Sequence, residues 1–229
     1  MAVVATIGFF DGVHSGHRQI LSSLVKAARS RGASSLVVTF WPHPRTILQQ
    51  DAREFRLLTN ISEKVDMIRR AGVDDVKVLT FSKEFSRMNT EQFIRDVLIG
   101  KFSVTTLLVG YDNRMGSDLL SPDETASIAS SLSLEVLRCP SFEKDGVTVS
   151  SSVIRRAIAQ GRMKEASSLL GYNYSISGVV VSGNRLGRTI GFPTANMQLY
   201  DPLRQLPECG VYGVKVRVLG KEYGGMTNI

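Results

Sequence analysis

Short apolar runs alternate with amphipathic stretches over about the first 140 residues of the chain. The apolar runs are rich in valine, leucine and isoleucine, as strands buried on both faces of a parallel sheet are. These runs cover residues 3–7, 36–40, 76–79, 107–109 and 134–137. The stretches between them have a helical period, and the connections are short. This alternation predicts a doubly wound α/β domain with a parallel sheet.

The ends of the predicted helices are marked by capping signals. An apolar stripe over residues 20–28 is followed by Gly32, a residue typical of a helix C-terminus. Residues 121–124 read Ser-Pro-Asp-Glu, which predicts an N-cap, a proline at the first helical position and a capping box. Residues 89–92 predict a similar helix start.

The pattern changes after residue 150. Two short helices are predicted at 151–159 and 163–170, and strands follow at 176–181, 211–219 and 223–229 with a hairpin turn at 219–222. We therefore expect an α/β domain over residues 1–156, a helical linker over 157–173 and an all-β domain over 174–229.

Composition and charge narrow the function classes only in part. With 229 residues and 43% hydrophobic positions the chain can bury a core without disulfides. No apolar run approaches the roughly 20 residues that span a bilayer, and the N-terminus has no signal-peptide pattern. Cys139 and Cys209 lack a C-x-x-C spacing, which suits a cytoplasmic protein. The net charge of +7 favours an anionic partner: a nucleotide, a nucleic acid or a membrane.

The strongest candidate site is the string GFFDGVHSGH at residues 8–17, directly after the first predicted strand. A glycine-rich turn from strand to helix places backbone N–H groups and the positive end of the helix dipole where nucleotide phosphates bind. His14 and His17 are three residues apart, so both can face one anion in the first helical turn. Gly16 lets a phosphate approach the backbone. Two simpler interpretations stay open: zinc ligands, or incidental histidines at a helix start.

Four motifs together resemble a known family. The H-x-G-H turn is similar to that of the nucleotidyltransferase superfamily, and residues 8–17 with 39–44 (TFWPHP) resemble the family of bacterial bifunctional riboflavin kinases/FMN adenylyltransferases, the FAD synthetases. Residues 149–155 (VSSSVIR) resemble the superfamily's second signature. Residues 187–196 (GRTIGFPTAN) resemble the flavokinase signature. The resemblance covers essentially the whole chain, in the family's order.

The resemblance implies a Rossmann-like nucleotidyltransferase domain followed by a partial antiparallel β-barrel of the riboflavin kinase type. It implies that the first domain converts FMN and ATP into FAD and pyrophosphate with Mg²⁺, and that the second phosphorylates riboflavin. His14, His17 and Arg155 are the expected catalytic residues. The expected nucleotide- and phosphate-binding residues are Gly8, Phe10, Asp11, Gly12, Gly16, His43, Ser150, Ser151 and Ser152.

The remaining motifs allow plain structural interpretations beside the functional ones. The serines at 150–152 can cap a helix as well as bind phosphate, and the Pro-His-Pro turn around His43 can be a rigid loop. Asp112 and Asn113 are expected to bind flavin, although Asn113 and Met115 stand where the family usually has aromatic residues.

In the β domain, Thr194 and Asn196 offer hard oxygen ligands for Mg²⁺ with ATP. Gly187 and Gly191 let the backbone approach the phosphates, although a glycine-rich β loop without a ligand has the same composition. The family's kinase glutamate lies well downstream of the P-T-A-N segment, and nothing follows Ile229, so we expect a truncated domain with negligible kinase activity.

Two rival functions are weighed against adenylyl transfer to FMN. Another small phosphate, such as a pantetheine phosphate, could be the acceptor, but the flavokinase-like tail argues against it. A basic α/β protein could bind nucleic acid, but aromatics are 7% of residues and no Lys/Arg cluster interleaves with them. We therefore expect ATP, FMN and riboflavin as partners, no nucleic acid or membrane, and a monomer or weak oligomer.

Overall fold

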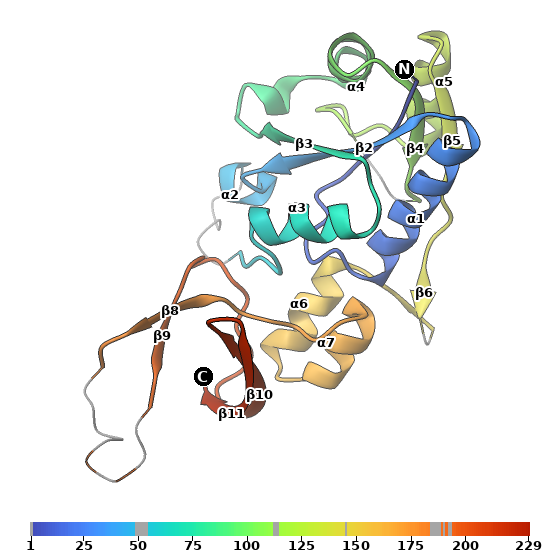
Figure 1. The fold of residues 1–229 in the computed structure, drawn as a ribbon. Helices are drawn as coiled ribbons and strands as arrows, with labels where there is room; N and C mark the ends of the chain where they lie inside the picture. Colours follow the sequence, from blue (N-terminus) through green and yellow to red (C-terminus); the bar gives the residue numbers. More distant parts are fainter. Residues whose placement is uncertain are drawn as a thin grey trace. The chain divides into compact units, whose positions relative to one another are not determined.

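The computed structural model describes residues 2–48, 55–111, 115–144, 146–183, 189, 191 and 194–229. The contacts between residues divide the chain into two units (Figure 1). Unit 1 comprises Met1–Phe55 and Ile61–Ser151, and unit 2 comprises Arg56–Asn60 and Ser152–Ile229.

Unit 1 contains a five-stranded sheet in which every pairing is parallel. Its strands are β1 (Val3–Ile7), β2 (Ser34–Trp41), β3 (Asp75–Thr80), β4 (Val104–Val109) and β5 (Glu135–Arg138). Their order is β3-β2-β1-β4-β5, so the direction of winding reverses between β1 and β4. Ligands of open α/β sheets bind at the carboxyl ends of the strands at this reversal. The predicted parallel α/β domain is confirmed. The loops after β1 and β4 are therefore the expected location of a ligand site.

Helices cover both faces of this sheet. They are α1 (Ser15–Ser30), α2 (Pro44–Leu48), α3 (Ile61–Arg70), the 3₁₀ turn η1 (Phe85–Arg87), α4 (Thr90–Gln92), the π-helical η2 (Phe93–Lys101) and α5 (Pro122–Ser131). A short hairpin of β6 (Glu143–Lys144) and β7 (Val147–Thr148) precedes the end of unit 1.

Neighbouring residues of β1 pack into two different apolar clusters, one on each face of the sheet. Val4 packs with side chains of α1 and α3, whereas Ala5 packs with side chains of η2 and α5. Because successive side chains of a strand point to opposite faces, a sheet covered on both sides needs apolar residues at consecutive positions. This is why the strands of unit 1 are continuous apolar runs.

The capping signals form as the sequence predicts. Ser121 and Asn89 each close a capping box, with Glu124 and Gln92 respectively. Gly32 follows α1 with a φ of 58°, in the left-handed region that glycine adopts at little cost.

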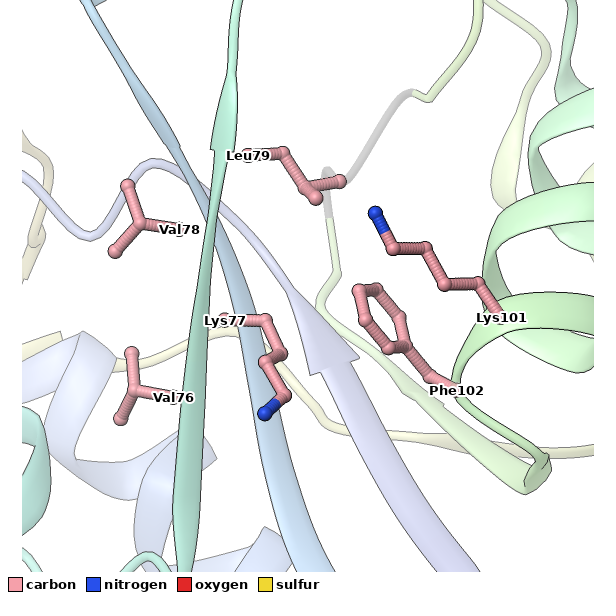
Figure 2. Close-up of a pocket in the computed structure, with 6 residues that line it drawn as sticks. All are labelled: Val76, Lys77, Val78, Leu79, Lys101 and Phe102. Carbon is pink, nitrogen blue, oxygen red and sulfur yellow. The ribbon is translucent and has the colours of Figure 1, made fainter.

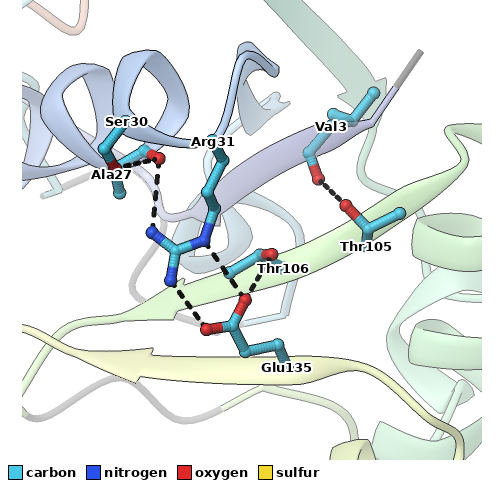
Figure 3. A network of polar contacts seen from close by, with 7 residues as sticks. All are labelled: Val3, Ala27, Ser30, Arg31, Thr105, Thr106 and Glu135. Carbon is cyan, nitrogen blue, oxygen red and sulfur yellow. Dashed lines mark hydrogen bonds and ion pairs between the residues drawn. The ribbon is translucent and has the colours of Figure 1, made fainter.

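Helix α1 is also tied to the sheet by a polar network (Figure 3). The Arg31 guanidinium donates to both carboxylate oxygens of Glu135, at 2.7 and 3.3 Å, and Thr106 Oγ1 donates to the same carboxylate at 2.9 Å. These hydrogen bonds hold the pKa of Glu135 below its usual range. Both partners are partly exposed, so water screens the attraction between their charges.

Unit 2 contains two helices and two antiparallel strand pairs. These elements are α6 (Ser151–Ala159, beginning at the last residue of unit 1), α7 (Met163–Leu170), β8 (Gly178–Val181), β9 (Asn196–Leu199), β10 (Val211–Val218) and β11 (Lys221–Asn228). Strand β8 pairs with β9, and β10 pairs with β11 through a two-residue turn. Leu219 and Gly220 of that turn both have positive φ, as a twisted hairpin requires.

A segment from the first part of the chain belongs to unit 2. The Leu57 N–H donates to Leu203 O at 2.7 Å, and the Gln205 N–H donates to Leu57 O at 2.8 Å. Sequence reasoning placed residues 56–60 within the first domain, whereas these backbone hydrogen bonds attach them to the second unit. Among the described residues, no helix is long and apolar enough to cross a membrane.

Candidate active site

The loop between β1 and α1 has an unusual backbone. Phe10, Gly12 and Val13 have φ values of 49°, 79° and 34°, and the Val13 N–H donates to Phe10 O at 3.1 Å. Positive φ is costly for Phe and Val, and such residues cluster where the surroundings enforce a functional conformation. The loop is therefore a constrained element rather than an ordinary connection.

Hydrogen bonds to two other segments, β2 and the start of α6, hold this loop. The Gly8 N–H donates to Val38 O at 3.1 Å, and Thr39 Oγ1 donates to Phe9 O at 3.3 Å. Ser151 Oγ donates to Asp11 O at 2.9 Å. The serine-rich motif and the first motif, 140 residues apart in the chain, thus meet in unit 1.

His14 caps α1 and fixes its own orientation in doing so. Its Nδ1 accepts a hydrogen bond from the His17 backbone N–H at 3.3 Å. An imidazole nitrogen that accepts carries no proton, so the proton of the neutral ring is on Nε2. The His14 and His17 rings are stacked, with centroids 3.6 Å apart and planes 17° from parallel. The two histidines that the sequence singled out are in contact at the N-terminus of α1.

His17 is neutral under ordinary conditions. Burial lowers its pKa well below 6.5, and the charges of His14 and Lys64 lower the pKa further. Its ring lies edge-on to Phe10, with centroids 5.1 Å apart. Its Nδ1 is buried and has no hydrogen-bond partner among the described residues. Buried polar atoms are normally hydrogen-bonded, which makes this nitrogen stand out among the described residues.

Lys64 is a site residue that sequence reasoning missed. It comes from α3, is 5% exposed, and donates from Nζ to Phe9 O at 3.0 Å and to Phe40 O at 3.1 Å. Burial lowers its pKa to about 8, while the nearby Asp11 carboxylate acts in the opposite direction. The available signal was a lysine at helical spacing from an apolar residue, one turn before Ile68, in a segment for which no helix was predicted.

His43 joins a row of rings at the end of β2. Its ring centroid lies 5.0 Å from that of Phe9 and 4.6 Å from that of Phe55. Its Nδ1 accepts from the Arg45 N–H at 3.2 Å, and the Arg45 guanidinium lies 5.3 Å from the Phe55 centroid. Phe9 is 37% exposed, so this row offers a partly open aromatic surface beside the loop.

The other predicted site residues of the first motifs divide between the units. Ser150 and Ser151 belong to unit 1, whereas Ser152 and Arg155 belong to unit 2, where Arg155 donates to Ser152 Oγ at 3.2 Å. The role of Arg155 stays a prediction.

The loop after β4 is described only in part. Asp112 and Asn113 lie outside the described residues, so their expected role in flavin binding stays a prediction. Met115 is buried in the core between the sheet and η2, where it serves packing. Gly116 has a φ of 76° and lies against Thr90, where any side chain would collide.

In unit 2, Thr194 and Asn196 are exposed at the start of β9, and Gly191 has a φ of 83°. A side chain at Gly183 would collide with the Asn196 amide. Gly187 lies outside the described residues. Exposed hydroxyl and amide oxygens are suitable ligands for a hard cation such as Mg²⁺ that is bound together with phosphates. No group of three or more His, Cys, Asp or Glu that could hold a metal occurs in the part of the chain that the structure describes.

A separate hollow of about 430 Å³ lies along β3 and the end of η2 (Figure 2). Its lining residues are Val76, Lys77, Val78, Leu79, Lys101 and Phe102. None of them is a predicted site residue, and the hollow flanks the edge strand of the sheet rather than the loop after β1.

Comparison with known families matches both parts of the chain. The family model described as FAD synthetase matches residues 1–153, and the model described as riboflavin kinase matches residues 170–229. The first match alone covers well over half of the chain.

Named relatives agree with these matches. The bifunctional riboflavin kinase/FMN adenylyltransferase of Escherichia coli K12 is 39% identical over 99% of this chain and 72% of its own length. The Bacillus subtilis and Listeria monocytogenes proteins of the same name are 36% and 34% identical, each over 99% of this chain and 71% of its own.

A solved structure has the same fold. The crystal structure of a Streptococcus pneumoniae protein, described as a macrolide-efflux protein, is 33% identical and superposes with a TM-score of 0.90. The match covers 99% of this chain and 73% of that one. On the two family matches and the curated relatives, the chain belongs to the family of bifunctional riboflavin kinase/FMN adenylyltransferases.

Proposed function

We propose that unit 1 transfers the adenylyl group of ATP to FMN, giving FAD and pyrophosphate, at the carboxyl edge of the sheet between β1 and β4. The observation that carries this proposal is the stacked pair of His14 and His17 at the N-terminus of α1, directly after the buried strand β1. The first turn of a helix after a buried strand is where α/β folds bind phosphate.

The reaction is an in-line displacement at the α-phosphorus of ATP. A phosphate oxygen of FMN forms the new P–O bond, and the bond to the bridging oxygen of the β-phosphate breaks, so the electron pair leaves with pyrophosphate. Charge shifts among the oxygens of the α-phosphoryl group in the transition state, and preorganised donors stabilise that charge.

His14 and His17 supply such donors. The hydrogen bond from the His17 N–H to His14 Nδ1 leaves the His14 proton on Nε2, which can donate to an α-phosphoryl oxygen. The low pKa of His17 keeps its ring neutral, so the two stacked rings avoid the repulsion between two adjacent cations. Backbone N–H groups of the first turn of α1 add to these donors.

The serine-rich motif binds the leaving phosphates in this proposal. The Ser151 hydroxyl touches the Asp11 carbonyl, which supports a place for Ser150 and Ser151 beside the loop. Arg155 would pair with the β- and γ-phosphates, as guanidinium groups do. Asp11, Gly12 and His43 would shape the nucleotide and flavin pocket, together with Asp112 and Asn113 from the loop after β4.

The sequence alone predicts negligible kinase activity, but the riboflavin kinase model matches residues 170–229. For unit 2 we therefore propose phosphorylation of riboflavin to FMN, the substrate of unit 1. Thr194 and Asn196 would hold Mg²⁺ together with ATP phosphates, since both are exposed and offer hard oxygens. The cation, when bound, neutralises the charge of the triphosphate. Gly183 and Gly191 would let the chain pass close to the phosphates.

One assay tests the two activities separately. The protein is incubated with ATP and Mg²⁺ and with either riboflavin or FMN, and the flavins are then separated. FAD formed from FMN supports adenylyl transfer by unit 1, and FMN formed from riboflavin supports kinase activity of unit 2. FMN left unchanged, with adenylylation of a pantetheine phosphate in a parallel reaction, would establish a different acceptor. Salt-sensitive binding to polynucleotide without any effect of FMN would favour the nucleic-acid function instead.

A further inference from the structure

Lys64 is buried in unit 1, and its ammonium group donates hydrogen bonds to two backbone carbonyls, those of Phe9 and Phe40. A charged lysine is costly to bury, so its presence in an otherwise apolar part of α3 needs a reason. Both carbonyls lie at the carboxyl ends of neighbouring strands, which locates that reason at the active-site edge.

The two carbonyls lie next to the segments that carry site residues. Phe9 O belongs to the loop between β1 and His14, and Phe40 O belongs to the end of β2, three residues before His43. One ammonium group therefore joins the loop after β1 to the end of β2. Thr39 Oγ1 donates to the same Phe9 carbonyl at 3.3 Å, so that oxygen is held from two sides.

We propose that Lys64 is a positioning residue for adenylyl transfer: it clamps the Phe9 and Phe40 carbonyls, holds the loop after β1 in its positive-φ conformation, and thereby places His14 and His17. This inference rests on the proposed function of unit 1. Phe10 and Val13, two non-glycine residues with positive φ in this loop, need such an external anchor.

The charge of Lys64 has a second effect on the same site. It is one of the causes that lower the pKa of His17, together with burial and the charge of His14. Asp11, buried in the loop itself, acts on Lys64 in the opposite sense and favours its charged form. Lys64 thus supports both the geometry of the loop and the neutral state of His17.

The test replaces Lys64 with a residue of similar length that cannot donate. In Lys64→Met we expect the kcat of FAD formation to fall about 100-fold, the cost of a misplaced catalytic group, with the KM values for ATP and FMN largely unchanged. The midpoint of the His17 ring titration, followed by NMR without substrate, should rise because a nearby positive charge is removed.

A matched control separates positioning from stability. Ile68 lies one turn further along α3, is fully buried in the apolar core, and has no group that could donate to a carbonyl. Ile68→Val should lower the melting temperature while leaving kcat and the His17 midpoint unchanged. Thr39→Val probes the Phe9 carbonyl independently and should lower kcat by about 2- to 10-fold, the equivalent of one neutral hydrogen bond.

The outcomes are distinguishable. Wild-type kcat and an unchanged His17 midpoint in folded Lys64→Met would overturn the inference while leaving the proposed function intact. If the wild-type protein forms no FAD, the proposed function fails. The His17 midpoint in Lys64→Met then still tests whether the charge of Lys64 acts on His17. If Lys64→Met does not fold, Thr39→Val decides, and an unchanged kcat in that variant would overturn the inference.

Discussion

Gly16 leaves room for the His14 ring at the start of α1. A β-carbon at this position would lie 3.3 Å from two atoms of that ring and 3.6 Å from Phe142 Cβ. These distances are tight, so the ring would have to move, and its hydrogen bond to the His17 N–H would weaken. The glycine between the two histidines therefore serves their geometry as well as the approach of a phosphate.

Gly16→Ala is expected to separate activity from stability. Alanine favours the helix by up to about 1 kcal/mol over glycine, so the melting temperature should not fall greatly. The kcat of FAD formation should fall about 10- to 100-fold because His14 is displaced. Ser22→Ala, at an exposed position of the same helix, is the control and should keep full activity. Full activity in Gly16→Ala would show that the His14 ring need not stay where it is.

The lowered pKa of His17 predicts how stability depends on pH. Its pKa is lowered in the folded protein, whereas in the unfolded chain the pKa is near its ordinary value of 6.5. Below pH 6.5 the unfolded chain binds a proton that the folded protein does not, so this contribution to stability is present above pH 6.5 and is lost as pH falls. By pH 5 the loss reaches at most about 2 kcal/mol.

Urea unfolding at pH 7 and pH 5 measures this loss, with His17→Gln as the reference protein. The wild type should lose more stability than the variant between the two pH values. Equal losses in both proteins would contradict a lowered pKa for His17.

Among single residues, the sequence pointed to His14 and His17 but not to Lys64, which contacts the loop before them. His14, His17 and Gly16 stand in a recognisable spacing after a strand, and each lies where that spacing predicted. Lys64 carries no motif. Its role depends on carbonyls that only the folded chain brings together, so a lysine at helical spacing from an apolar residue was the one available signal.

At the scale of elements, the loop after β4 is packed against the start of α4. Gly116 has a φ of 76°, and a side chain there would collide with the Thr90 backbone N–H and with the Asp118 carboxylate that accepts from it. The Thr90 hydroxyl also donates to Met115 O at 2.7 Å. This glycine therefore anchors the loop that carries the predicted flavin-binding positions.

Gly116→Ala is expected to destabilise the protein by about 2–4 kcal/mol, the sum of positive-φ strain and the collision. Gly72→Ala is a matched control, because Gly72 also has positive φ, 90°, but has open space around it. That variant should lose only about 1 kcal/mol. Equal losses in urea unfolding would mean that the contact with Thr90 contributes nothing.

Elements with a strong local signal were predictable, and those set by distant contacts were not. The strands of unit 1 are continuous apolar runs because both faces are buried, and α5 begins at a complete capping box. Residues 56–60 carry no comparable pattern. They join unit 2 through backbone hydrogen bonds to Leu203 and Gln205, which composition cannot report.

For the whole molecule, the family matches suggest which ligands suit its net positive charge. A net charge of +7 was compatible with nucleotides, nucleic acid or membranes. The family matches over residues 1–153 and 170–229 fit small-molecule substrates, and of these ATP and FMN carry negatively charged phosphates. The two units then correspond to two reactions in which the product of one, FMN, is the substrate of the other.

We propose that His14 and His17 act as one unit in adenylyl transfer. The most direct test measures FAD formation from FMN and ATP by the wild type, His14→Ala, His17→Ala and the double variant, with circular dichroism to verify folding. Each single variant should lose on the order of 100-fold or more in kcat, and the double variant little more than the worse single one, because groups that act together are not additive. Wild-type turnover in either folded single variant would contradict a catalytic role for this histidine pair.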